Sequence, residues 1–102
     1  MLIKTQTGDL INLAHVIAIS CTCVRHSSKD TPVYEVYAQT VNDDEHTLKK
    51  IHYEAEFTHD EYGYIELDDF EVARQEQEAD ALIEDIFKAY ERGEKVFCVS
   101  KP

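Results

Sequence analysis

The segment from Asp68 to Gly93 is the longest periodic stretch of the chain, and it places the strongest constraint on the fold. Its apolar residues recur at spacings of three, four and seven, the pattern of one stripe along an α-helix. They are Val72, Ala79, Leu82, Ile83, Ile86, Ala89 and Tyr90. Asp68 and Glu71 have the spacing of a capping box, and Gly93 can end the helix in the left-handed conformation. Because such a helix is not stable alone in water, other elements must cover its stripe.

The residues before this helix alternate in the manner of β-strands. Leu2–Thr5 and Leu10–Leu13 flank a turn at Gly8, which predicts a small hairpin. Val16–Val24 is rich in β-branched residues, so we expect it to be the most buried strand, with Ile17, Ile19, Cys21 and Cys23 sharing one face.

A second, longer hairpin is predicted from Val33–Val41 and Thr47–Phe57, which alternate on either side of a turn at 42–45. We expect Tyr53 and Phe57 on the covered face of its second strand. Glu84 lies four residues before Lys88 on the outer face of the helix, which favours an ion pair.

A turn over Thr58–Gly63, a short strand over Tyr64–Leu67 and a final strand over Lys95–Val99 complete the expected elements. Strands followed by one helix predict an α+β fold. We expect an antiparallel sheet or open roll of about five to seven strands, then one long C-terminal helix and a short final strand. A chain of 102 residues is enough for one domain, 1–102.

Charge is distributed unevenly along the chain. The net charge is −11, yet residues 42–85 alone hold sixteen acids and three bases, so the remainder is slightly basic. The polar loop Arg25–Pro32 belongs to that basic part and lies outside the acidic half in sequence, and we expect it to be mobile. The acidic stretch disfavours direct binding to nucleic acid, which relies on Lys and Arg.

The sequence holds no signature of catalysis, a cofactor or a membrane span. It has no Gly-rich phosphate loop, nucleophile elbow or HExxH motif, and no apolar run near the ~18 residues of a span. Cys21, Cys23 and His26 suggest zinc only weakly, because paired zinc cysteines are usually separated by two to four residues. We therefore expect a soluble cytoplasmic protein that is not an enzyme, with no metal or cofactor and with reduced thiols.

The acidic stretch contains exposed-looking tyrosines as well as carboxylates, a combination typical of interaction surfaces. The predicted partner-binding residues are Asp43, Asp44, Glu45, Glu54, Glu56, Asp60, Glu61, Tyr62, Tyr64 and Glu66. Tyr34, Tyr53 and Tyr90 are instead expected in the core. The leading hypothesis is a non-enzymatic module that docks on a basic protein partner. The alternative for this surface is a solvated face without any partner.

The two ends of the chain resemble a known group of proteins. The opening MLIKTQTGDLINLAHVIAI and the close from Glu76 to Val99 are similar to the first strands and the terminal helix and strand of small uncharacterised bacterial and prophage proteins. The resemblance carries no activity or site residues. In size and charge alone the chain also resembles phage-encoded anti-CRISPR inhibitors, which implies a nucleic-acid-binding effector as the partner.

Two further hypotheses belong to different classes. A homo-oligomer, a possible homodimer with a structural or accessory role, could form through the helix or an open strand edge. A small metal-dependent hydrolase could use pairs such as Glu54 and Glu56, or His59 with Asp60 and Glu61, although adjacent residues on a turn rarely converge on one point.

Overall fold

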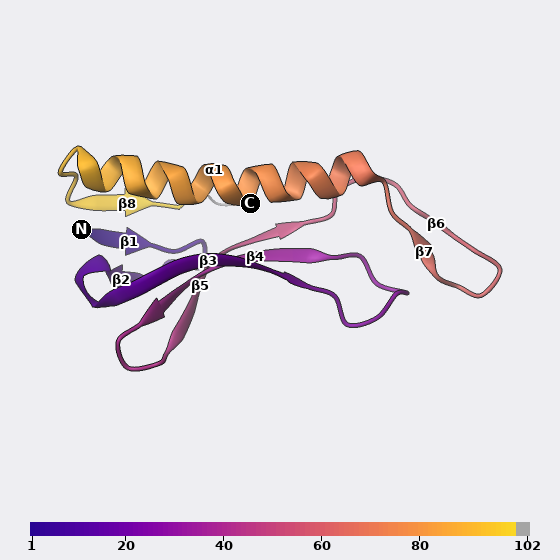
Figure 1. The fold of residues 1–102 in the computed structure, drawn as a ribbon, viewed down its shortest axis with the longest axis horizontal. Coiled ribbons are helices and arrows are strands. Elements are labelled where there is room, and N and C mark those ends of the chain that lie inside the picture. Colours follow the sequence, from indigo (N-terminus) through magenta and orange to yellow (C-terminus); the bar gives the residue numbers. More distant parts are fainter. Residues whose placement is uncertain (100–102) are drawn as a thin grey trace.

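The helix α1 (Asp69–Glu91) runs along the long axis of a molecule with extents of 52 × 26 × 19 Å (Figure 1). This computed structural model describes residues 1–99. The helix lies on one side, and most of the strands lie beneath it in a second layer. A short hairpin projects past the first turn of the helix and makes the molecule elongated.

Helix α1 begins where the sequence predicts, but its first turn is capped by Asp68 alone and not by a capping box. The side chain of Asp68 accepts a hydrogen bond of 2.9 Å from the backbone N–H of Phe70, so Asp68 is the N-cap. The predicted capping box with Glu71 does not form. The Glu71 carboxylate instead accepts a hydrogen bond from Nε of Arg74 at 2.6 Å, because a full guanidinium charge competes well against one backbone N–H.

The end of α1 follows the prediction closely. Gly93 has a φ of +73°, and the backbone N–H of Glu94 reaches back to the carbonyl of Ala89 at 3.1 Å. This is the left-handed end of a Schellman motif. Glu84 and Lys88 form the expected ion pair, with Oε1 and Nζ 3.1 Å apart.

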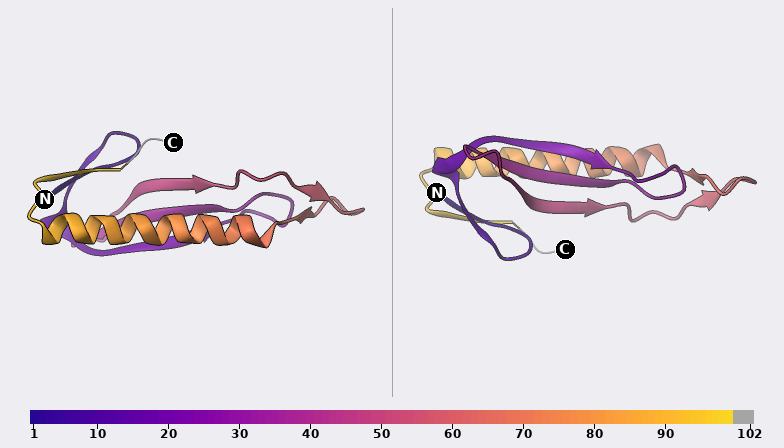
Figure 2. Two further views of the ribbon diagram at one scale, coloured as in Figure 1. Left: turned by 90° about the horizontal axis from the view of Figure 1, so that it is seen from above. Right: turned by 90° about the horizontal axis from the view of Figure 1, so that it is seen from below.

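The main sheet consists of β3 (Val16–Val24), β4 (Val33–Thr40) and β5 (Glu45–His52), all antiparallel and in that order. The long hairpin of β4 and β5 is confirmed. However, β5 ends at His52, short of the predicted Phe57, and residues 53–57 are irregular. One face of this sheet packs on α1, and the other face is open to solvent (Figure 2).

A smaller sheet combines both ends of the chain. The predicted hairpin of β1 (Leu2–Lys4) and β2 (Leu10–Asn12) forms, and β8 (Val96–Cys98) pairs with β1 in parallel. A 3₁₀ turn over Leu13–His15 leads from β2 into β3. The third sheet is the projecting hairpin.

That projecting hairpin consists of β6 (Thr58–His59) and β7 (Ile65–Glu66), where a turn and one short strand were predicted. Seven strands therefore precede the described helix and one follows it, which confirms the α+β prediction.

The core lies between α1 and the two larger sheets and includes residues from all three elements. Its buried members are Ile3, Ile11, Val36, Ala38, Leu48, Ile51, Ala79, Leu82, Ile86 and Val99. The apolar stripe of the helix is thus covered as expected, with one exception. Tyr90 was predicted in the core but is 59% exposed, because it lies at the edge of the stripe that faces β3.

Gln75, a residue of α1, is fully buried on the sheet side of the helix and attaches the helix to the sheet. Its Nε2 donates to the carbonyl of Pro32 at 2.9 Å and to that of Ile51 at 3.0 Å. These carbonyls lie just before β4 and near the end of β5, so one side chain satisfies two backbone groups that leave the sheet ladder. Its Oε1 has no hydrogen-bond partner within residues 1–99.

The strand β3 is not the most buried strand, contrary to the prediction. None of its residues is buried, Ile17 is 60% exposed, Cys23 is exposed and Cys21 is half-buried. Two causes explain the difference. The strand lies at the edge of the sheet, and a register shift between Val16 and Ala18 turns Ile17 away from the face that Ile19 shares with the core.

Candidate functional site

The predicted partner-binding residues divide into two groups that the fold does not bring together. Asp43 and Asp44 lie in the turn between β4 and β5, and Glu45 begins β5. The other seven lie between the end of β5 and the start of α1. Figure 1 shows the β4–β5 turn and the β6–β7 hairpin at opposite ends of the long axis. A single acidic surface from Asp43 to Glu66 is therefore not formed.

The β6–β7 hairpin owes its turn to Asp60. Its Oδ1 accepts hydrogen bonds of 2.9 Å from the backbone N–H groups of both Tyr62 and Tyr64. Gly63 supplies a φ of +83°, which its neighbours could not adopt without strain. Asp60 is thus a turn-forming residue rather than a partner that orients His59, and the arrangement leaves the Tyr62 ring 70% exposed.

The basic loop before β4 lies against this hairpin. The backbone N–H of Ile65 donates to the carbonyl of Ser28 at 2.9 Å. Nζ of Lys29 lies 5.9 Å from the centroid of the Tyr64 ring, which is within the range of a cation–π contact. Within the loop, the guanidinium of Arg25 donates to the carbonyls of Ser28 and Asp30.

Arg74 engages the acids beside the helix start. Its guanidinium donates to Glu71 Oε1 and Glu78 Oε2, both at 2.6 Å, and lies 3.8 Å from Glu54 Oε2. It also donates to the carbonyl of His52 at 3.0 Å, which fixes the end of β5. The hydrogen bond from Arg74 lowers the pKa of the Glu71 carboxyl, and the same bond raises the pKa of Arg74. Glu54 and Glu71 are therefore partly neutralised.

Two of the predicted carboxylates at this end have no hydrogen-bond or ion-pair partner among the described residues. Glu56 and Glu61 are exposed, and no hydrogen bond or ion pair engages either carboxylate within the part of the chain that the structure describes. Glu66 is exposed as well, and its Oε2 accepts from the Thr58 hydroxyl at 3.5 Å. Of the predicted carboxylates at the hairpin end, Glu56 and Glu61 thus have no bonding partner in the described residues, whereas Asp60 and Glu66 accept hydrogen bonds from neutral donors and keep their charge.

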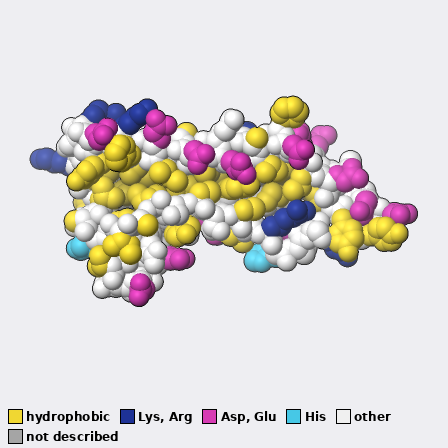
Figure 3. Space-filling view, viewed as in Figure 1, with side chains coloured by type: hydrophobic (Ala, Val, Ile, Leu, Met, Phe, Trp, Pro, Cys, Tyr) yellow, Lys and Arg dark blue, Asp and Glu magenta, His cyan; other side chains and the backbone are white. Residues whose placement is uncertain are grey.

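Exposed aromatic rings lie among these carboxylates. Tyr62 and Tyr64 are exposed, as predicted. Phe57 was expected in the core but is also exposed, because the chain leaves β5 before it reaches that residue. Phe70 is 88% exposed at the start of α1. Figure 3 shows hydrophobic and acidic side chains side by side at this end of the molecule.

Sequence reasoning did not single out Phe70, although a signal was present. Phe70 directly follows the N-cap pair Asp68 and Asp69 and lies off the apolar stripe of the helix, so it could have been placed on the solvent side. A large ring in that position contributes nothing to the core. An exposed aromatic patch is more informative than single exposed apolar residues, because it marks interaction surfaces.

The surroundings of Cys21 and Tyr34 do not activate either group. Burial raises the pKa of the Cys21 thiol, and the nearby Asp80 carboxylate raises it further, so the thiol stays protonated at neutral pH. Burial also raises the pKa of Tyr34, whose hydroxyl donates to Glu76 Oε1 at 2.9 Å. Within residues 1–99 no three Cys, His, Asp or Glu side chains are grouped to hold a metal ion.

Comparison of the chain with protein-family models, with curated proteins and with solved structures found no match. In the described residues no helix is both long and apolar enough to cross a membrane. The resemblance of the two chain ends to prophage proteins remains an expectation from sequence.

Proposed function

We propose that this chain is a non-enzymatic protein-binding module whose hairpin end docks on a basic partner. The hairpin-end surface is defined by Glu56, Phe57, Glu61, Tyr62, Tyr64 and Phe70. One observation carries the proposal: four exposed aromatic rings and two unpaired carboxylates occur between Glu56 and the first turn of α1, at the end of the molecule where the β6–β7 hairpin projects.

The chemistry of this surface suits a cationic partner. Tyr and Phe rings bury large areas on docking, and their faces attract Lys and Arg. Carboxylates at the rim speed the encounter with a positive surface and fix its orientation. The net charge of −11 also attracts a cationic partner over a longer range.

A sharper form of the proposal concerns the type of partner. Proteins that handle nucleic acid hold a cationic channel that a carboxylate surface can occupy in place of phosphates. A CRISPR effector is the example that the size and charge of the chain bring forward. In that case the chain acts as an inhibitor, and nucleic acid and this protein compete for one site.

The test is capture of partners from a bacterial lysate that contains CRISPR effectors, with the full chain as bait and mass spectrometry as the readout. The variant E56K/E61K reverses both unpaired carboxylates. The variant D44K/E45K makes the same charge change at the opposite end of the molecule and serves as the matched control. We expect the wild type and the control to retain one nucleic-acid-handling protein at low salt, and E56K/E61K to lose it.

Competition with nucleic acid then tests the sharper form. Displacement of the retained protein by added nucleic acid supports a shared cationic site. Equal retention by all three baits would show that the hairpin end is not the docking surface. If no protein is retained specifically even at low salt, the acidic residues act only as a solvated surface.

A further inference from the structure

The two edges of the main sheet differ in whether other residues hydrogen-bond to them. The edge of β5 is covered by Gln6, whose backbone N–H donates to the carbonyl of Leu48 at 2.9 Å and whose Oε1 accepts from the N–H of Lys50 at 3.0 Å. The outer edge of β3 pairs with no other strand among residues 1–99. A nine-residue edge of unpaired backbone groups is a template for another strand.

The sequence of β3 lacks the usual protection of an exposed edge. Such edges are normally protected by Lys, Pro or an inward-pointing charge. Residues 10–24 contain no Lys, Arg, Asp, Glu or Pro, in a chain in which 30% of residues are charged. Only the register shift near Val16 interrupts the edge, so Ala18–Val24 remains free to pair.

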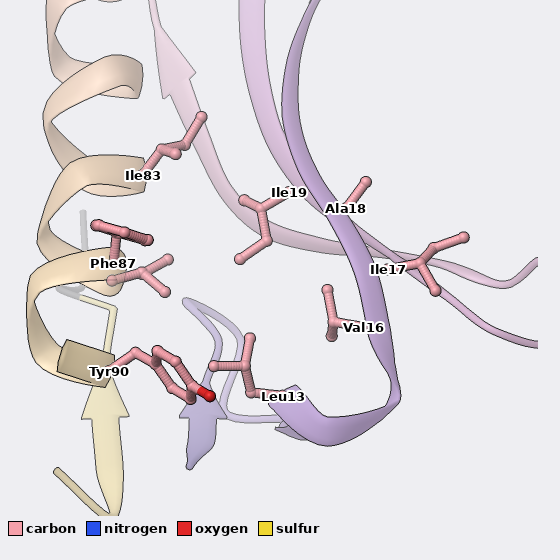
Figure 4. Close-up of a pocket in the computed structure, with 9 residues that line it drawn as sticks. Leu13, Val16, Ile17, Ala18, Ile19, Ile83, Phe87 and Tyr90 are labelled. Carbon is pink, nitrogen blue, oxygen red and sulfur yellow. The ribbon is translucent and has the colours of Figure 1, made fainter. Parts of the chain in front are cut away.

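An apolar hollow lies beside this edge, between β3 and the last turns of α1. Its volume is 260 Å³. Figure 4 shows Tyr90 pointing from the helix toward Leu13, with Ile83 and Phe87 on the helix side of the hollow and Ile19 on the strand side. Phe87 and Tyr90 are each 59% exposed. In Figure 3 a continuous hydrophobic band follows the flank of the helix along the molecule.

From these features we propose that the outer edge of β3 pairs antiparallel with β3 of a second copy of this chain. A two-fold axis near Cys21 would join two three-stranded sheets into one sheet of six strands. The seam over Ala18–Val24 would be roughly 23 Å long, since a strand rises about 3.3 Å per residue. The proposal rests on the β3 edge and is independent of the hairpin-end surface.

An uncharged antiparallel edge is complementary to a copy of itself, so a second copy is the occupant that we propose. Two molecules with a net charge of −11 repel each other, yet β3 itself holds no charge, so the repelling groups lie away from the axis. The helix α1 runs antiparallel to β3. Near the start of β3, Leu13 and Ile19 lie beside Ile83 and Tyr90 of the last helix turns. Near its end, Cys23 pairs with Tyr34, whose hydroxyl bonds to Glu76 in the first half of the helix.

The same symmetry places complementary ends of the two helices opposite each other. Across the axis, the start of one helix faces the end of its mate. Residues 69–80 hold five acids and one base, whereas residues 88–95 hold three bases and two acids, with Lys88 and Arg92 already paired to Glu84 and Glu94 of their own chain. The two helix dipoles are also opposed, which is favourable. Because each hollow lies beside the start of its own β3, it would face the start of the mate's helix across the axis.

The first test is the mass of the full chain by size-exclusion chromatography with light scattering over a dilution series. We expect twice the 11.8 kDa of one chain at high concentration. The variant I17K/T22K places lysines on two exposed positions of β3, and we expect it to keep the mass of one chain at every concentration. Because two added positive charges reduce the net charge from −11 to −9, general repulsion cannot explain that loss.

The variant T47K/H52K is the matched control, since it adds the same charge to exposed positions of β5 and should remain a dimer. Far-UV circular dichroism checks that each variant is folded. If I17K/T22K unfolds, F87D provides a second disruption from the helix side of the hollow.

A short bismaleimide cross-linker gives an independent readout through native thiols. With Cys98 replaced by Ser, Cys21 and Cys23 of two copies should be joined across the seam, whereas C21S/C23S, which retains Cys98, should yield little cross-linked dimer. A wild type of single mass at every concentration overturns the proposal and leaves the edge to a strand of another protein. A dimer that persists in both I17K/T22K and F87D overturns the placement on β3.

Discussion

The helix–sheet interface and the projecting hairpin are organised by different forces. At the interface, apolar residues of α1, β4, β5 and the terminal strands bury one another, and the one large polar side chain, Gln75, donates two hydrogen bonds. At the hairpin end, two strands of two residues each are held by the Asp60 turn and by Lys29 and Ser28 of the basic loop. Its large rings stay in solvent.

The contrast indicates which region sets stability and which is available for binding. Apolar burial stabilises the first region, whereas Phe57, Tyr62 and Phe70 are exposed and stabilise the fold little. The proposed function gives these rings a role in contact with a partner. Substitutions should therefore separate the two regions, with large losses of stability in the core and small or local effects elsewhere.

The largest effect is expected from Ile86→Ala, in the buried stripe of α1. Ile86 is 2% exposed, and its truncation should lower the free energy of unfolding by about 2–5 kcal/mol through lost burial and a cavity. Phe70→Ala, in the same helix, should change it by no more than about 0.5 kcal/mol. Urea denaturation followed by circular dichroism measures both. Similar losses for the two variants would contradict the division.

Gln75→Ala tests the polar attachment within the core. Its removal leaves the carbonyls of Pro32 and Ile51 without their donor, and we expect a loss of about 2 kcal/mol. Gln77→Ala, two residues away on the exposed face, is the matched control and should be nearly neutral. The same urea experiment decides, and an unchanged midpoint for Gln75→Ala would show that water replaces the side chain.

Asp60→Ala should loosen the hairpin without affecting the core. The variant loses the acceptor of two backbone N–H groups, so local opening should become easier by about 1 kcal/mol. Hydrogen exchange of the Tyr62 and Tyr64 amides should accelerate, while exchange in β4 stays unchanged. Glu61→Ala is the control. Faster exchange throughout the protein would show that the hairpin and the core unfold together.

The smallest effect is expected from Glu71→Gln and concerns pH. Arg74 lowers the pKa of Glu71 in the folded state, so its stabilisation is complete above the ordinary value of 4.5 and is lost as pH falls through the lower folded pKa. At neutral pH the variant should be slightly less stable than the wild type. On acidification its stability should fall by less than that of the wild type. Urea midpoints against pH measure this. Glu54→Gln, whose carboxylate is mostly exposed, should follow the wild-type profile.

The sequence by itself determined the elements whose signals are local. Periodicity, the Asp68 cap and Gly93 determined the long helix almost to the residue, and alternation predicted the β4–β5 hairpin. These succeed because hydrogen bonds and side-chain spacing within one element depend on neighbours in the chain. The α+β class, with strands before one long helix and a short strand after it, followed from the same patterns.

Only the tertiary structure decided which faces and ends are covered. Ile17 and Tyr90 carry the pattern of buried residues, yet β3 is an edge strand and the helix covers only one side of it. The acidic stretch from Asp43 to Glu66 is continuous in sequence, but two turns direct its halves to opposite ends of the molecule. Strand order and the direction of a hairpin depend on contacts between distant residues, which no local pattern specifies.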